Sequence, residues 1–176
     1  MKHKHTGRGI GVMATVLALC VAGGSAMAAD RDRDPDLLGL TVGYFDILHN
    51  DDAAAEFRVE YRPSFNMWVM KPFVGGMATT DGAVHGYAGI LFDVPFGRFR
   101  FTPSFAPGYF YEGNGKDLGH RIEFRSQMEI GYVLPNGGRV AVNFNHISNA
   151  GIGTNNPGSE SLGLTYAVPL DLLTGF

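Results

Sequence analysis

The sequence is poor in cysteine and has no excess of basic residues. Its single cysteine, Cys20, lies within an N-terminal apolar segment, so a chain that loses this segment has no disulfide and no thiol chemistry. The 176 residues carry 14 Lys and Arg against 17 Asp and Glu, a formal net charge of -3. This balance argues against nucleic acid as a partner.

Long hydrophobic runs are absent beyond the N-terminus. No later segment approaches the ~18 apolar residues that a membrane-spanning helix needs. The N-terminus itself combines three basic residues among its first eight, an apolar run over residues 10–23 and an Ala-x-Ala sequence that ends at Ala28. We favour a secretory signal peptide over a membrane anchor, because the apolar run is short and ends in glycine and serine. We therefore expect residues 1–28 to be cleaved, leaving a single domain over residues 29–176 whose net charge is -6.

The rest of the chain contains short segments rich in aromatic and β-branched residues, separated by turn residues. This pattern is typical of strands, and no stretch shows a helical period. The expected strands cover residues 37–48, 53–64, 67–78, 83–94, 98–111, 120–134, 138–148 and 159–169.

Several of these segments have one charged face and one apolar face. In the second, the charged face comprises Glu56, Arg58, Glu60 and Arg62, and the apolar face Phe57, Val59 and Tyr61. A soluble sandwich or lipocalin-like barrel would bury the apolar face, whereas a transmembrane barrel turns that face to lipid and fills its lumen with paired charges. The strand lengths match the ~9–11 residues that cross a bilayer. We therefore predict an all-β fold, an eight-stranded antiparallel transmembrane β-barrel of the outer membrane with Arg/Glu ladders in its lumen.

Residues 143–160 hold the residue types of an acyl-transfer triad. With an even number of strands and a periplasmic N-terminus, the loop 149–158 is expected to be extracellular. Counting by twos from the apolar faces of the last two strands places His146, Ser148 and Glu160 on the lipid-facing exterior, near the rim. Because these strands form a hairpin, His146 can lie opposite or diagonal to Glu160.

The chemistry of these three residues is that of an ester hydrolase. Ser148 needs a base to accept its proton, His146 can be that base, and Glu160 can orient the imidazole ring. Backbone N–H groups of the glycine-rich turn at Gly151, together with Asn149 and Asn156, are candidates for stabilising an oxyanion. At this depth the ester of a lipid is within reach, and lipid A of the outer leaflet fits.

Other readings of these residues carry less weight. A His-x-Ser sequence is common by itself, and Asn/Gly/Pro clusters are ordinary loop residues. His146 and Glu160 are too few ligands to predict a metal site, and we expect neither metal nor cofactor. His49, His85 and His120 lack a neighbouring serine and acid, so we interpret them as loop or lumen residues.

The segment His146-x-Ser148-Asn149-Ala150-Gly151, followed by Asn156-Pro157-Gly158-x-Glu160, resembles the outer-membrane lipid A 3-O-deacylases of the PagL type. The resemblance covers about twenty residues. It implies an eight-stranded barrel with Ser148 as nucleophile, His146 as base and Glu160 as orienting acid on the lipid-facing exterior. It also implies that Asn149, Gly151 and Asn156 support the oxyanion hole.

The implied activity is hydrolysis of the ester-linked 3-hydroxyacyl chain at the 3 position of lipid A, without a cofactor. The expected partners are lipid A or lipopolysaccharide and outer-membrane lipid, with a homodimer left open. The expected location is the bacterial outer membrane, with the active site facing the outer leaflet. Two alternatives remain: a phospholipase or acyltransferase acting at the same rim, and a small structural barrel without enzymatic activity.

Overall fold

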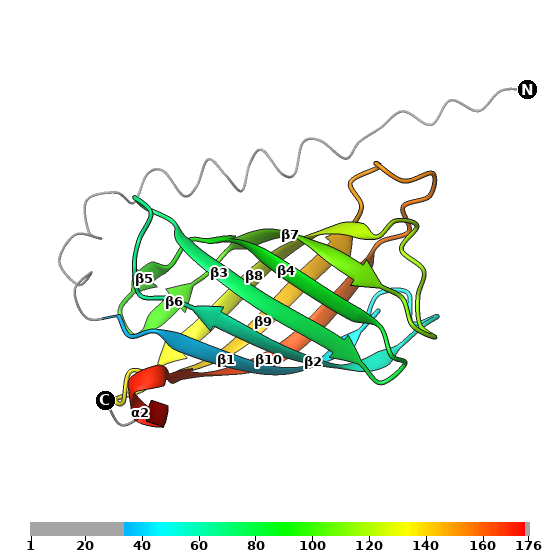
Figure 1. The fold of residues 1–176 in the computed structure, drawn as a ribbon. Coiled ribbons are helices and arrows are strands. Elements are labelled where there is room, and N and C mark those ends of the chain that lie inside the picture. The colour runs from blue at the N-terminus through cyan, green and yellow to red at the C-terminus, as the bar shows by residue number, and fades with distance from the viewer. Residues whose placement is uncertain (1–33, 175–176) are drawn as a thin grey trace, which may run out of the picture. The chain divides into compact units, whose positions relative to one another are not determined.

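The computed structural model describes residues 34–174, so the expected signal peptide lies outside the described residues. Antiparallel strands dominate this part of the chain (Figure 1). They are β1 (Leu37–Phe45), β2 (Ala54–Arg62), β3 (Lys71–Thr79), β4 (Val84–Leu91), β5 (Val94–Phe96), β6 (Phe99–Phe101), β7 (Ser104–Tyr111), β8 (Ile122–Val133), β9 (Arg139–Ser148) and β10 (Ser159–Pro169). A short helix, α2 (Leu170–Thr174), follows β10. Among these residues no helix is long and apolar enough to cross a membrane.

The strands close into a barrel. β1 pairs with both β2 and β10, and β8 pairs with β9 on one side and with β6 and β7 on the other, so the sheet closes on itself. β4 with β5, and β6 with β7, each form one interrupted strand, which gives the predicted eight. The interruptions fall at residues 92–93 and 102–103, where Pro103 cannot donate a hydrogen bond. The predicted fold class, an eight-stranded antiparallel transmembrane β-barrel, is confirmed.

Some strands are shorter than the sequence analysis predicted. β1 ends at Phe45 rather than at residue 48, because Asp46 adopts a positive φ of 60° and starts a turn. β3 begins at Lys71 rather than at residue 67, because Met67 and Met70 pair across a tight turn. The connections of residues 46–53, 80–83, 112–121 and 149–158 lie at one end of the barrel, which we call the site end; the turn at Met67–Met70 lies at the other end.

Polar side chains fill one side of the lumen. Arg62 donates to both Glu60 and Glu129, with Nη–Oε distances of 2.7 Å and 2.6 Å, and Tyr87 donates to Glu60 at 2.8 Å. Arg125 Nη1 contacts the same Glu60 at 3.0 Å. The predicted Arg/Glu ladders are thus present on β2 and β8, where these buried charges have partners. Glu123 of β8 is the exception in this set: it is buried, and neither of its carboxylate oxygens has a hydrogen-bond partner among the described residues.

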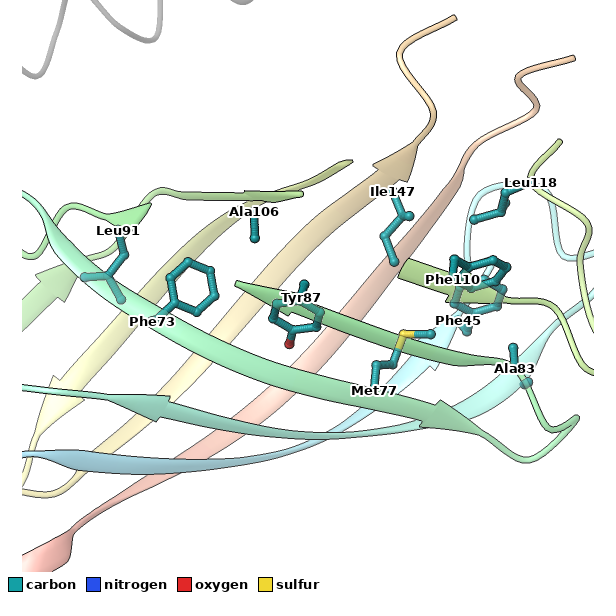
Figure 2. Close-up of a cluster of buried hydrophobic side chains, with 11 residues drawn as sticks. Phe45, Phe73, Met77, Ala83, Tyr87, Leu91, Ala106, Phe110, Leu118 and Ile147 are labelled. Carbon is teal, nitrogen blue, oxygen red and sulfur yellow. The ribbon is translucent and has the colours of Figure 1, made fainter. Parts of the chain in front are cut away.

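The other side of the lumen is mostly apolar, which the sequence analysis did not predict; His85, which it interpreted as a loop or lumen residue, is buried there beside Tyr87 and Phe110. Rings and aliphatic side chains from β3, β4 and β7 pack against each other, with Phe45, Leu118 and Ile147 at the site end (Figure 2). Glycines make room for the rings: a Cβ on Gly75 would lie 2.7 Å from the Tyr87 ring. The lumen is therefore a packed core and not an open channel on this side.

The outward positions of the strands are apolar, as predicted. On β10 the exposed side chains are Leu162, Leu164 and Tyr166, and on β1 they are Leu40, Val42 and Tyr44. This exposed band is the lipid-facing surface of the barrel.

Candidate active site

The β9–β10 hairpin sets His146 directly opposite Glu160. His146 Nδ1 lies 2.8 Å from Glu160 Oε1, a hydrogen-bond distance. This contact assigns a proton to Nδ1 and leaves Nε2 free to accept one from a substrate or a nucleophile. The two strands thus place an imidazole and a carboxylate within hydrogen-bond distance from facing positions.

Both side chains of this pair lie on the outer surface, next to the lipid-facing band. His146 continues the outward series of Val142 and Phe144 on β9, and Glu160 continues that of Leu162 on β10. The His146 side chain is 44% exposed and that of Glu160 is 14% exposed. A carboxylate held by a histidine on this face has no part in the polar network of the lumen.

Ser148 is the last residue of β9, two positions after His146 and on the same face. The strand rise places their Cβ atoms ~7 Å apart, which allows the side chains to lean together. Among the described residues, no hydrogen bond joins Ser148 to His146. Catalytic hydrogen bonds of this kind are often long before substrate binds.

The loop after Ser148 begins with a tight turn. Ala150 and Gly151 have φ values of 54° and 82°, as in a type I′ turn, and Ile152 N donates to the Asn149 carbonyl at 3.1 Å. A positive φ at Ala150 is uncommon for a residue with a Cβ.

The asparagines of this loop hold it in place. The buried amide of Asn149 donates to the carbonyls of Leu118 and Asn155, at 2.9 Å and 2.7 Å. Asn149 also accepts the Gly151 N–H at 2.9 Å, and its own N–H donates to Asn156 Oδ1 at 3.0 Å. Both N–H groups of the Asn149 side-chain amide are therefore engaged within the loops.

Gly158 packs against the imidazole ring of His146. Its φ is 65°, and a Cβ built on it would lie 2.9 Å from His146 Cε1. Glycine is needed here for two reasons, its left-handed backbone and the close approach of the ring. The loop thus holds His146 from one side while Glu160 holds it from the other.

The structure brings a second histidine to this site. His49, in the turn between β1 and β2, has Nδ1 3.5 Å from Glu160 Oε2. The sequence analysis interpreted His49 only as a loop or lumen residue. The sequence analysis could not place His49 beside Glu160, because the two residues come together only through the pairing of the first and last strands. Local sequence patterns do not reveal that pairing.

A buried ion pair lies beneath these loops, outside the membrane-spanning strands. Asp46 Oδ1 contacts Lys116 Nζ at 2.5 Å and Ser159 Oγ at 3.2 Å, and Asp46 Oδ2 accepts from Asp52 N at 3.2 Å. Burial raises the pKa of Asp46, but Lys116 and these hydrogen bonds outweigh burial and hold the pKa below its ordinary value of 3.8. The ion pair joins the loops of residues 46–53 and 112–121, and the Ser159 hydrogen bond adds the start of β10.

No group of three or more His, Cys, Asp or Glu side chains within residues 34–174 is arranged to hold a metal ion.

Comparison with solved structures supports the fold. The chain is similar to the crystal structure of the outer membrane enzyme PagL, with 18% identity and a TM-score of 0.59, covering 76% of this chain and 99% of that one. It is also similar to Neisserial surface protein A, with 11% identity and a TM-score of 0.52, covering 76% of this chain and 95% of that one. A de novo designed transmembrane β-barrel matches at 13% identity and a TM-score of 0.50, covering 77% and 96% of the two chains. A search of curated proteins found no match to this sequence.

Comparison with protein families covers most of the barrel. A family model described as lipid A 3-O-deacylase (PagL) matches residues 40–169, from β1 to the end of β10. The matched region contains His146, Ser148 and Glu160. The chain therefore belongs to the lipid A 3-O-deacylase (PagL) family.

Proposed function

We propose that the protein is a serine esterase of the outer membrane that removes the ester-linked 3-hydroxyacyl chain from the 3 position of lipid A. The observation that carries this proposal is the 2.8 Å contact between His146 and Glu160 on the outward face of the β9–β10 hairpin. A base and its carboxylate on this face point to the lipid-facing exterior near the rim and not into the lumen. Membership of the lipid A 3-O-deacylase family supports the choice of lipid.

The proposed reaction has two stages. Ser148 Oγ attacks the ester carbonyl while His146 Nε2 takes the hydroxyl proton. The tetrahedral intermediate then expels the 3-hydroxyl of the sugar, which receives the proton from His146. Water, activated by the same base, attacks the acyl-serine, regenerates Ser148 and releases the 3-hydroxy fatty acid. Glu160 stabilises the imidazolium that forms in both stages.

The proposed oxyanion donors are backbone N–H groups of the turn after Ser148. Asn149 and Gly151 currently donate theirs to asparagine side chains, whereas the N–H of Ala150 has no partner among residues 34–174. In the proposal Asn156 supports this turn by holding Asn149 through its side chain. Fixed donors of this kind stabilise the charge that develops on the carbonyl oxygen.

The proposed orientation turns the site end outward. The two longest connections, residues 112–121 and 149–158, lie at the site end, and outer-membrane barrels carry their longer loops on the extracellular side. Ser148 would then meet the outer leaflet at the depth where acyl chains join the headgroup. The substrate partner is lipid A or lipopolysaccharide, and a homodimer remains open as an assembly.

The purified barrel in detergent tests the proposal. We expect wild-type protein to release a 3-hydroxy fatty acid from lipid A, and Ser148→Ala to lower kcat about 10³-fold or more. Ser161→Ala is the matched control, because its hydroxyl faces the lumen and donates to Glu56 at 2.6 Å. That control should keep its activity.

Two results would redirect the assignment. Equal hydrolysis of a glycerophospholipid would favour a phospholipase at the same rim. A folded wild-type barrel that hydrolyses neither lipid would favour a structural barrel.

A further inference from the structure

Glu160 has one carboxylate oxygen that the triad does not use. Oε1 contacts His146, whereas Oε2 is buried and has no hydrogen-bond partner among the described residues. A buried carboxylate oxygen without a partner is costly and therefore calls for a nearby donor. The closest candidate is His49, whose Nδ1 lies 3.5 Å from Oε2.

The turn that carries His49 is fastened to Glu160 through the backbone. Ile47 N donates to the Glu160 carbonyl at 3.0 Å, and Asn50 N donates to the Asp46 carbonyl at 2.8 Å. The Tyr44 hydroxyl donates to Asn50 Oδ1 at 2.6 Å. The His49 ring is thus carried by a turn that is hydrogen-bonded on both sides of it.

A buried ion pair also holds the turn that carries His49. Asp46 forms the buried pair with Lys116 described above, and His49 Nδ1 lies 3.9 Å from Asp46 Oδ1. The His49 imidazole therefore faces two carboxylates: both oxygens of Asp46 already have hydrogen-bond partners, whereas Oε2 of Glu160 has none among the described residues. An N–H group at His49 Nδ1 is therefore best placed to donate to Glu160 Oε2.

We propose that His49 is a positioning residue that holds Glu160 through Oε2, so that both carboxylate oxygens are fixed when Oε1 orients His146. A carboxylate bound at one oxygen can rotate about its last torsion and lose alignment with the imidazole. A second contact removes this freedom and fixes the ring for proton transfer. His49 touches neither the nucleophile nor the base, and it acts through Glu160 alone. This inference rests on the proposed function of the same site.

The test compares His49→Ala, which removes the donor, with His49→Asn, whose side-chain N–H can replace Nδ1. His120→Ala is the matched control, because His120 is another exposed histidine of the site end, and within residues 34–174 its ring is hydrogen-bonded only to the backbone of Ile122. Each variant is purified as the full barrel, and activity is normalised to the folded fraction measured by heat-modifiable gel mobility. The readouts are kcat and KM on lipid A, and the rate at which a fluorophosphonate probe labels Ser148.

We expect His49→Ala to lower kcat and the labelling rate about tenfold while KM stays within about twofold. His49→Asn should recover most of both rates, and His120→Ala should match the wild type. An unchanged kcat in His49→Ala would overturn the inference. So would a change confined to KM, or an Asn variant as slow as the Ala variant. A wild type inert toward both lipid A and the probe would instead contradict the proposed function, which separates the two failures.

Discussion

Polar side chains occur in two regions of this barrel, and they are satisfied to very different degrees. In the lumen, Arg62 is 5% exposed and is hydrogen-bonded to two glutamates. On the outer face at the site end, His146 is 44% exposed and makes one side-chain contact, with Glu160. Both sets belong to one closed sheet, the first on its inner face and the second on its outer face.

We infer from this difference that the lumen side chains serve the stability of the barrel and that the outward-facing pair serves the proposed reaction. A charged group in the lumen is needed because removing it leaves a buried partner unpaired. A polar group on the lipid-facing side satisfies nothing in the fold and replaces an apolar residue that lipid would favour. We therefore expect lumen substitutions to change stability with little effect on activity, and substitutions at the rim to do the reverse.

The largest effect on stability should follow loss of Arg62. Both oxygens of Glu129 bind Arg62, so Arg62→Met leaves a buried carboxylate without its partner. We expect a loss of about 3–5 kcal/mol in unfolding free energy, measured by urea unfolding in lipid vesicles. The outward Val59→Ala on the same strand is the control and should cost far less. A strong loss of activity per folded molecule in Arg62→Met would contradict the separation.

A large effect on activity should follow substitution of Gly158. A Cβ there would lie 2.9 Å from His146 Cε1 and would force a positive φ on alanine. We expect Gly158→Ala to lower kcat about 100-fold, because a displaced base loses its alignment. Gly82→Ala is the control, since Gly82 also has a positive φ but has open space around its Cβ. Equal activity of the two variants would show that the His146 contact is unimportant.

The smallest effect should come from acidification of the loop network around Asp46. The folded pKa of Asp46 is lowered, so its contribution to stability is present above the ordinary value of 3.8 and is lost as pH falls through the folded pKa. We expect Asp46→Asn to have a lower Tm than wild type at pH 7. This difference should shrink as pH falls below about 4. A Tm difference that stays constant down to pH 3 would show that the carboxylate charge contributes nothing.

Much of the barrel could be predicted because a transmembrane strand alternates strictly. Charged and apolar residues in β2 and β8 follow a period of two, which gave the lumen face. The same period in the apolar faces of β9 and β10 gave the outward direction of His146 and Glu160, and turn residues between the segments gave the strand number. The sequence analysis allowed His146 to lie opposite or diagonal to Glu160. In the structure the hairpin register sets the two residues directly opposite each other.

The apolar half of the lumen was harder to predict. β3, β4 and β7 carry glycines at inward positions, such as Gly75 beside Tyr87 and Gly89 beside Ala106. A glycine on the inner face interrupts the polar-apolar alternation, so the pattern gave no clear face there. The role of a glycine that makes room for a ring depends on the partner strand, which a single sequence does not reveal.

The surroundings of Glu160 could not be predicted for a related reason. His49 lies in the turn after β1, and it reaches Glu160 only because the barrel closes through the β1–β10 pair. The loop contacts of Asn149 with Leu118 also join segments far apart in sequence. Local patterns identify a motif, whereas the contacts that hold it depend on barrel closure.

The most direct measurement of the central claim is mass spectrometry of lipid A from cells that express the wild type or Ser148→Ala. Heat-modifiable gel mobility confirms that both barrels are folded. The account predicts that the wild type removes one 3-hydroxyacyl chain from the 3 position and that Ser148→Ala leaves lipid A intact. Unchanged lipid A in cells with folded wild-type protein, or loss of the same chain with Ser148→Ala, would contradict it.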